Sequence, residues 1–228
     1  MASTSPLNKT RPTPRIRPAT LADKEAWVSA NLAGYELDPS FQWRYPKRKE
    51  FPEDARKASG DVFEMALGIS SITCVVAELP RIDDEEPGDT DWVVVAVAMW
   101  EWKDWEEVQI PASFSSPASG RRDMDPIRQK LFIETITAAE KQYFGHEWGK
   151  KRLVLADLAA DPKYHRRGAG KALLQYGSPM GRYLYTHLGF KELGYVDCGI
   201  KGEEKRIRTW IMVWLPEGWS KESIVELT

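Results

Sequence analysis

The sequence predicts an α/β protein that folds as a single domain. The chain has 228 residues, a length typical of one domain that can bury a sizeable core. Apolar residues recur at helical spacing over residues 22–37 and 53–67, whereas residues 71–79, 92–103 and 153–160 are apolar runs typical of β-strands. Helices that precede and separate strands along one chain indicate the α/β class.

The composition indicates a folded protein without a strong overall charge. Hydrophobic residues make up 42% of the chain and charged residues 29%, which is the ordinary range for globular proteins. The 32 Lys and Arg residues against 34 Asp and Glu residues leave a formal net charge of -2, which disfavours binding to a nucleic acid backbone. No apolar run is long enough to cross a bilayer. We therefore expect neither a nucleic acid nor a membrane as partner, and the oligomeric state stays open.

The cysteines and the N-terminal residues bear on the compartment. Cys74 and Cys198 stand in strand-like runs, as small buried apolar residues do, and their spacing suits neither a disulfide framework nor a metal site. We therefore expect no metal and a cytoplasmic location. The proline-rich composition predicts a disordered leader over residues 1–14 and a folded domain over residues 15–228. The basic residues of the leader allow an import signal as the alternative, although its prolines would break an amphipathic helix.

The folded domain is predicted to begin with a short strand at residues 15–20 and a helix over residues 22–37. Thr20 is a suitable cap for that helix, and a second helix follows at residues 53–67. Aromatic residues crowd between the two helices, namely Phe41, Trp43, Tyr45 and Phe51. They either wall a ligand pocket or pack beneath a loop, and packing is the favoured interpretation.

A hairpin and an insertion are predicted next. Residues 71–79 and 92–103 form an antiparallel pair around an acidic loop at residues 83–89. That loop is either simply solvated or a rim that attracts a cationic substrate. We assign residues 104–149 to an insertion, in which an irregular stretch precedes a helix that ends near Phe144.

A glycine-rich loop follows the apolar strand at residues 153–160. The loop reads Arg166-Arg167-Gly168-Ala169-Gly170-Lys171, and a helix is expected from Ala172. Glycines let a ligand approach the backbone, while amides and the helix dipole face an anion. The pattern therefore predicts a phosphate-binding loop, although such a loop can also be an ordinary turn. Its spacing differs from the nucleotide triphosphatase loop and from the dinucleotide-binding motif.

The same region resembles a known family. Residues 158–174 resemble the coenzyme A signature of the GCN5-related N-acetyltransferase (GNAT) family, residues 178–190 are similar to its next helix, and residues 15–23 to its first strand and helix. The resemblance implies a GNAT-type mixed β-sheet flanked by helices, with acetyl-coenzyme A as co-substrate and no metal. It also implies transfer of the acetyl group to a primary amine of a small molecule or peptide, by direct attack in a ternary complex.

The resemblance further implies a cofactor site. Backbone groups of Leu158 and Ala160 would bind the pantetheine arm as an added strand would, and the loop amides would hold the pyrophosphate. His165 stands where the family usually has Gln or Arg. The implied cofactor-binding residues are Leu158, Ala160, His165, Arg166, Arg167, Gly168, Ala169, Gly170 and Lys171.

Candidate catalytic residues follow from the needs of acetyl transfer. Tyr185, at the tyrosine position of the family, would protonate the leaving thiolate, and its alternative is a packed tyrosine. Asp157 interrupts an apolar strand, where a carboxylate is costly unless it is paired or functional. Asp157 is therefore the candidate base, which would take the proton of the amine directly or through a water molecule. The alternative is a carboxylate with a structural role only. The amide near Ala160 would donate to the thioester carbonyl. Three tryptophans could line an acceptor cleft or be ordinary core and edge residues: Trp100, Trp102 and Trp105.

One part of the family pattern is missing. The family has a helix end, a turn and a fifth strand between its two signature helices, but here Ser178 follows closely on Leu174. A parallel strand needs a crossover of a dozen or more residues. We therefore expect a sheet shortened between the signature helices, two helices that meet at residues 177–179, and an unpaired side on strand 153–160. The alternative function is a catalytically impaired coenzyme A-binding or interaction protein.

The chain is predicted to end with a second pair of strands. Residues 191–198 and 206–215 are strand-like and close enough in sequence to pair with each other.

Overall fold

The computed structural model describes residues 12–82, 91–104, 120–144, 151–173, 186–187 and 189–215. The strands are β1 (Arg15–Pro18), β2 (Ile72–Pro80), β3 (Trp92–Asp104), β4 (Lys151–Ala160), β5 (Lys191–Cys198) and β6 (Ile207–Val213). The α-helices are α1 (Lys24–Tyr35), α2 (Pro39–Arg44), α3 (Pro52–Leu67), α5 (Pro126–Phe144) and α6 (Ala169–Leu173). A short 3-10 turn, η1 (Leu21–Asp23), precedes α1, and another, η4 (Pro162–Tyr164), follows β4.

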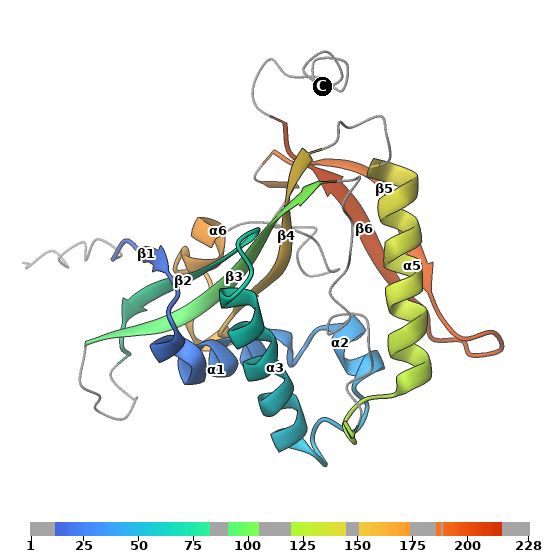
Figure 1. Cartoon of the computed structure of the whole chain (residues 1–228), viewed down its shortest axis with the longest axis horizontal. Coiled ribbons are helices and arrows are strands. Elements are labelled where there is room, and N and C mark those ends of the chain that lie inside the picture. Colours follow the sequence, from blue (N-terminus) through green and yellow to red (C-terminus); the bar gives the residue numbers. More distant parts are fainter. Residues whose placement is uncertain are drawn as a thin grey trace, which may run out of the picture.

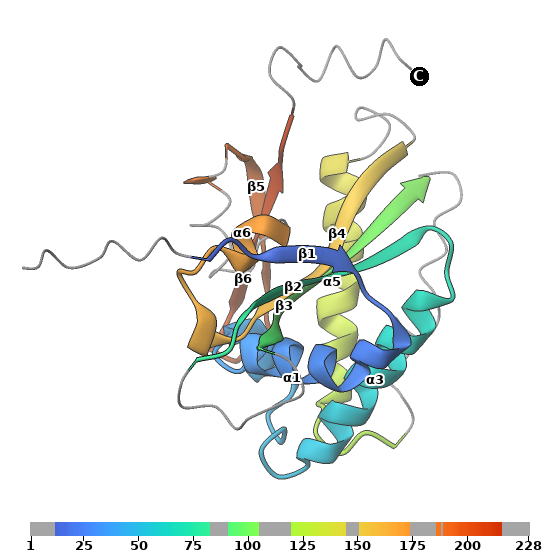
Figure 2. The ribbon, with the colours of Figure 1, turned by 90° about the vertical axis from the view of Figure 1, so that its left-hand side faces the viewer.

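Strands β1 to β4 form one antiparallel sheet in sequence order, and β5 and β6 form a separate antiparallel pair. Helices α1 and α3 cover one face of the four-stranded sheet, and α6 lies on the other (Figures 1 and 2). The core on the α1 side includes Trp27 and Phe63, whose rings stack 4.5 Å apart. The core on the α6 side includes Leu155 and Leu173. These two cores hold the sheet between two helical layers.

The C-terminal strands pack on α5 and not on β4. Figure 1 shows α5 alongside β5 and β6, and Ala139 and Phe144 of α5 form a core cluster with Ile211 of β6. A second cluster joins Trp43 of α2 to Cys198 at the end of β5. Within the described residues, β4 pairs with β3 alone. The other side of β4 is therefore without a strand neighbour in the part of the chain that the structure describes.

Local signals account for where the first helices begin. The Thr20 amide donates to Oδ2 of Asp23 at 2.8 Å, and Arg17 donates to both Asp23 oxygens at 2.8 and 2.7 Å. This ion pair lowers the pKa of Asp23 to about 2 and ties the end of β1 to the start of the helical segment. Helix α2 begins after Asp38, whose carboxylate accepts from the amide of Phe41 at 2.8 Å.

Most predicted elements are confirmed, including the fold class, the first hairpin, the helix from residue 126 and the C-terminal strand pair. Two details differ. Helix α2 was not expected, and α6 starts at Ala169 instead of Ala172, because the amide of Ala172 already bonds to the carbonyl of Gly168 at 3.0 Å. Both cysteines are buried and free, as predicted. The helix junction at residues 177–179, Tyr185, Trp105 and the acidic loop at residues 83–89 lie outside the described residues.

Candidate active site

A β-bulge positions the candidate base. Asp157 pairs with Met99 and Leu155 pairs with Trp100, so Ala156 has no partner across the ladder. Bulges re-aim side chains and are frequent beside active sites. Here the bulge lets Asp157 face α1, while Leu155 packs into the core on the α6 side. The break in the apolar pattern of this strand therefore coincides with a break in its geometry.

Asp157 is held by two side chains of α1. Nδ2 of Asn31 donates to Oδ2 of Asp157 at 2.7 Å, and the Tyr35 hydroxyl donates to Oδ1 at 2.5 Å. Ser59 of α3 in turn donates to Oδ1 of Asn31 at 3.2 Å. Burial raises the pKa of Asp157 to about 6, against the opposing effect of these donors and of the Leu158 amide. An aspartate with this pKa is ionised at neutral pH but is a stronger base than an ordinary one.

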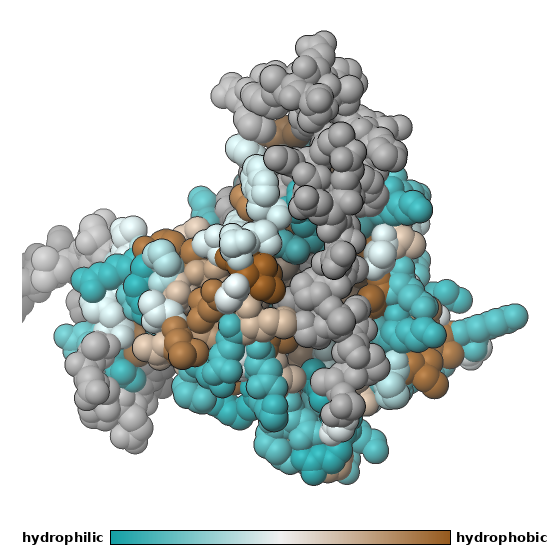
Figure 3. All heavy atoms as spheres, in the orientation of Figure 1, coloured by the Kyte–Doolittle hydropathy of each residue, from teal (hydrophilic) through white to brown (hydrophobic). Residues whose placement is uncertain are grey.

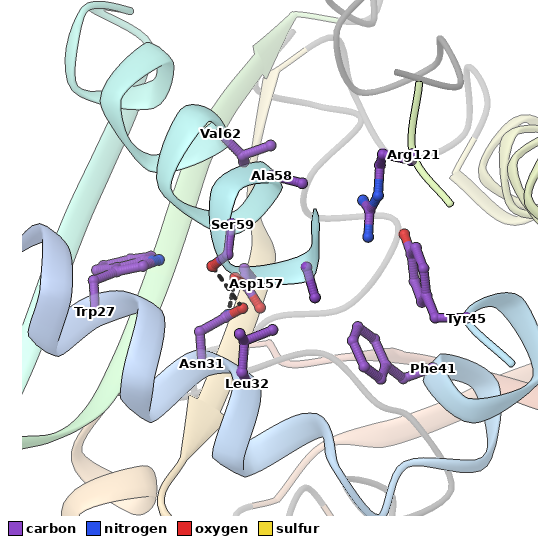
Figure 4. A pocket seen from close by; sticks show the side chains of 11 residues that line it. Trp27, Asn31, Leu32, Phe41, Tyr45, Ala58, Ser59, Val62, Arg121 and Asp157 are labelled. Carbon is purple, nitrogen blue, oxygen red and sulfur yellow. Dashed lines mark hydrogen bonds between the residues drawn. The ribbon is translucent and has the colours of Figure 1, made fainter. Parts of the chain in front are cut away.

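A pocket opens onto the Asp157 carboxylate between α1, α2 and α3 (Figure 4). Its volume is about 140 Å³. Its apolar wall consists of Trp27, Leu32, Phe41, Ala55, Ala58 and Val62. Its polar lining consists of Asn31, Tyr45, Ser59, Arg121 and Asp157. An apolar cleft with a few convergent polar groups and a carboxyl of shifted pKa is the usual form of a small-molecule site.

The aromatic residues around α2 divide between the two interpretations. Phe41 and Tyr45 line the pocket, which favours the ligand-pocket interpretation for them. Trp43 is 1% exposed and packs in a core cluster with Cys198, and the ring of Phe51 lies beneath the guanidinium of Arg122 at 4.5 Å. The packing interpretation is right for these two.

The tryptophans at the end of β3 do not line the pocket. Trp100 packs against the core on the α6 side of the sheet. Trp102 pairs with Leu153 across β3 and β4, and their exposed fractions are 53% and 52%. Figure 3, drawn in the orientation of Figure 1, shows apolar side chains over the region of the sheet and hydrophilic side chains over the outer end of α3. The other interpretation, ordinary core and edge residues, is therefore favoured for Trp100 and Trp102.

The open side of β4 presents the backbone groups expected to bind pantetheine. The Asp161 amide donates to the Val95 carbonyl at 2.8 Å, which makes this a hydrogen-bonded pair of the antiparallel ladder. Because such pairs alternate along the ladder, the N–H and C=O groups of Leu158 and Ala160 point away from β3. Nε2 of His165 lies 3.2 Å from the Ala160 carbonyl oxygen. His165 thus contacts one of the groups that an added strand-like ligand would use.

Helix α1 limits access to the end of β4. A Cβ atom placed on Gly34 would lie 2.7 Å from the backbone nitrogen of Ala160 and 2.9 Å from Cβ of Ala159. Only glycine fits at such a distance. The Ala160 nitrogen is thus covered by α1 and its carbonyl is contacted by His165, whereas the Leu158 amide hydrogen-bonds the neighbouring Asp157 carboxylate.

The glycine-rich loop has the features that an anion requires. Arg166 and Gly168 adopt positive φ angles of 59° and 94°, which curl the backbone before α6. Arg166 and Lys171 are exposed. Arg167 donates to the Pro80 carbonyl at 3.3 Å, and its buried Nη1 has no hydrogen-bond partner among the described residues. The residues present therefore fit a phosphate-bearing cofactor whose arm runs along β4.

The described residues hold neither a metal cluster nor a membrane-spanning helix. They contain no group of three or more His, Cys, Asp and Glu side chains that could hold a metal ion. No helix among them is long and apolar enough to cross a membrane.

Several site residues were not identified from the sequence, notably Asn31, Tyr35, Ser59 and Arg121. A local signal existed for the first two: Asn31 and Tyr35 follow Trp27 at successive intervals of four, on the face of the helix that packs inward. A buried polar residue on such a face needs a partner. Arg121 stands in an irregular loop, and no sequence pattern connects it to Asp157.

Known proteins share this fold. No protein-family model matches the chain. A protein of Stachybotrys chartarum named acetyltransferase is 23% identical over 225 aligned positions, which cover 87% of this chain and 90% of the relative. The crystal structure of an agmatine N-acetyltransferase matches with a TM-score of 0.56 and 14% identity, covering 88% of this chain and 99% of that one. The structure of a mosquito arylalkylamine N-acetyltransferase-like protein matches with a TM-score of 0.53 and 15% identity, covering 88% and 100%.

The architecture therefore defines a protein of the acetyltransferase fold class. More narrowly, this chain has the GNAT fold, and its resemblance to the GNAT family is confirmed at the level of the fold.

Proposed function

We propose that the protein is an N-acetyltransferase of the cytoplasm that transfers the acetyl group of acetyl-coenzyme A directly to a primary amine. One observation carries the proposal. At the bulge of β4, the Asp157 carboxylate faces a pocket on one side of the strand, and the Leu158 backbone faces the open strand edge. A base and an edge suited to pantetheine thus meet at one point of a GNAT fold. The name of the Stachybotrys chartarum relative supports the same reaction class.

The pocket would bind the amine, which is supplied by a small molecule or a peptide. An alkyl ammonium group with a pKa of roughly 10 must lose a proton before it can attack. Asp157 accepts that proton, directly or through a water molecule. Asn31 and Tyr35 each donate to one of its oxygens, so the carboxylate is held in place at the pocket that it lines.

Acetyl-coenzyme A, when bound, supplies the thioester whose carbonyl carbon the amine attacks. The backbone of Leu158 would hold the pantetheine arm, and its amide would donate to the thioester oxygen. We assign the donor role to Leu158 and not to Ala160, because α1 covers the Ala160 nitrogen. In the structure the Leu158 amide hydrogen-bonds the Asp157 carboxylate and lowers its pKa, so donation to the thioester would exchange this bond and leave the neighbouring carboxylate a stronger base.

The glycine-rich loop would hold the pyrophosphate. Its backbone amides, together with Arg166, Arg167 and Lys171, provide donors and positive charge at one end of β4. Tyr185 is proposed to protonate the leaving thiolate, which completes the set of proton transfers that the reaction needs.

A second candidate function is coenzyme A binding without efficient turnover. It is favoured by the lack of a second strand neighbour for β4 within the described residues and by the contact of His165 with the Ala160 carbonyl. The test is to incubate the purified protein with acetyl-coenzyme A and a panel of amines, and to detect acetylated amine and free coenzyme A by mass spectrometry. Formation of acetylated amine and free coenzyme A in equal amounts supports the acetyltransferase. Binding of acetyl-coenzyme A without either product supports the second candidate function.

A further inference from the structure

We infer that the acceptor is a small primary amine with an apolar, ring-sized body and a single cationic end, and that amines with a second cationic group are disfavoured. The inference rests on the proposed function, because it concerns the acceptor of the same site. Two observations carry it: the distribution of charge around the pocket, and a row of aromatic rings along its wall.

The charges of the pocket lie at different ends. Among the described lining residues, Asp157 is the sole carboxylate and Arg121 the sole cation. Figure 4 shows Arg121 and Tyr45 across the pocket from Asn31 and Ser59. The Asp157 end therefore attracts an ammonium group, whereas the Arg121 end does not.

Arg121 is itself held in place by a buried partner. Its Nε and Nη2 donate to the two oxygens of Asp123 at 2.8 and 2.6 Å, and Asp123 is 0% exposed. The Asp123 carboxylate is therefore used by Arg121 and does not face the pocket as a free anion. A second ammonium or guanidinium group at this end would lose its hydration and find no carboxylate among the described lining residues.

The wall between the two ends is aromatic. The ring of Tyr35 stacks on Phe41 with centroids 5.6 Å apart, and Phe41 contacts Tyr45 with centroids 4.6 Å apart. The Tyr35 hydroxyl bonds to Asp157, and Arg121 lies over the Tyr45 ring at 4.5 Å. Phe41 and Tyr45 line the pocket, and Tyr35, which stacks on Phe41, extends this row of rings to the base. Leu32 and Val62 add aliphatic surface, so an apolar ring of the substrate would be covered on several sides.

The size and charge of the pocket together define the substrate class. A volume of about 140 Å³ suits a small molecule better than a peptide chain. An arylalkyl monoamine places its ammonium group at Asp157 and its ring against the aromatic row. A diamine of similar length places a cation beside Arg121 and leaves the aromatic row without a partner.

The experiment compares 2-phenylethylamine with 1,4-diaminobutane and agmatine as acceptors, with acetyl-coenzyme A as donor. We expect kcat/KM for 2-phenylethylamine to exceed that for the two dications by about tenfold or more, the effect of roughly 1.4 kcal/mol in transition-state binding. Saturation-transfer NMR with the same three amines, in the presence of coenzyme A, measures binding without turnover and should give the same order.

A matched pair of variants tests the role of charge. Ala58 lines the pocket in the view of Figure 4. Ala58→Glu adds a second carboxylate and should shift both kcat/KM and NMR binding toward the diamine, whereas Ala58→Gln, of nearly the same size, should not. An unchanged preference in Ala58→Glu, confirmed as folded by circular dichroism, would contradict the inference.

The outcomes separate the two proposals. If no amine is acetylated, the proposed function fails, and the NMR binding order still decides the inference. If amines are acetylated but the dications are preferred or equal, the proposed function stands and the inference is overturned.

Discussion

The hydroxyl of Tyr35 on α1 donates a hydrogen bond of 2.5 Å to the Asp157 carboxylate on β4, so a helix and a strand jointly hold one carboxylate beside a pocket. The same tyrosine stacks on Phe41, which lines the pocket. Its hydroxyl lowers the pKa of Asp157 and thereby opposes the effect of burial. Tyr35 is therefore a positioning residue that also tunes the base.

Replacing Tyr35 by Phe should raise the pKa of Asp157 further, because a hydrogen bond to the ionised form is lost. The low-pH limb of the kcat/KM profile, with an expected midpoint near the Asp157 pKa of about 6, should move to higher pH. A merely structural role would lower the rate without moving this midpoint. Tyr195→Phe, in the distant β5–β6 pair, is the control and should leave the profile unchanged.

Asp157→Asn should reduce acetyl transfer by a factor on the order of 10² to 10⁴, the range for loss of a general base. Asparagine keeps the shape and one acceptor oxygen for Asn31 or Tyr35. Binding of coenzyme A, measured by calorimetry, should change little. Full activity in this variant would assign Asp157 to a structural role.

The same substitution has a signature in the pH dependence of stability. The folded pKa of Asp157, about 6, lies above the ordinary 3.8, so the folded state binds the proton more tightly than the unfolded state. This tighter proton binding stabilises the folded state fully below pH 3.8, and the stabilisation is lost as the pH rises through the folded-state pKa of about 6. The free energy of unfolding of the wild type, relative to Asp157→Asn, should fall by about 3 kcal/mol over this window. Urea unfolding at several pH values measures it, and parallel curves would contradict the raised pKa.

Gly168→Asp and Gly170→Asp should each weaken coenzyme A binding by more than tenfold, because they place negative charge at the pyrophosphate loop. Gly168 has φ of 94°, so any side chain there is also strained. Gly202, with φ of 93° and no atom near its missing Cβ, offers a matched control. Gly202→Asp should introduce the same backbone strain but leave the affinity for coenzyme A unchanged. Calorimetric affinities equal to wild type in both loop variants would remove the phosphate-loop assignment.

Gly34→Ala should destabilise the protein by about 1–3 kcal/mol, although alanine favours helices, because its Cβ would overlap the backbone of Ala160. Gly68 at the end of α3 is the control, since a Cβ there meets its nearest atom, the Met65 carbonyl oxygen, at 3.4 Å. Thermal unfolding should show a lower midpoint for Gly34→Ala than for Gly68→Ala. Equal midpoints would mean that α1 moves away from β4 without cost.

Tyr185→Phe should lower kcat by a factor on the order of 10², the usual effect of removing a general acid, while coenzyme A affinity stays nearly unchanged. Rapid-mixing kinetics with 2-phenylethylamine would separate the chemical step from product release. Undiminished turnover would make Tyr185 a packing residue.

Most helices, strands and turns were predictable from the sequence. The hairpin of β2 and β3, the helices beginning at Pro52 and Pro126, and the loop around Gly168 depend on turn residues, helix caps and periodicity, which act over a few neighbouring positions. Asp157 was also identifiable, because a carboxylate in an apolar strand is costly wherever the strand lies. The sequence by itself thus determined most of the elements, the fold class and one candidate for the base.

The pocket depended on tertiary structure. Asn31 and Tyr35 are 126 and 122 positions from Asp157 in the chain, and Arg121 joins them from an irregular loop. The bulge at Ala156 decided which face of the sheet Asp157 occupies. Side-chain partners of this kind are set by the packing of α1 and α3 on the sheet, and local propensity carries no information about which distant surfaces will meet.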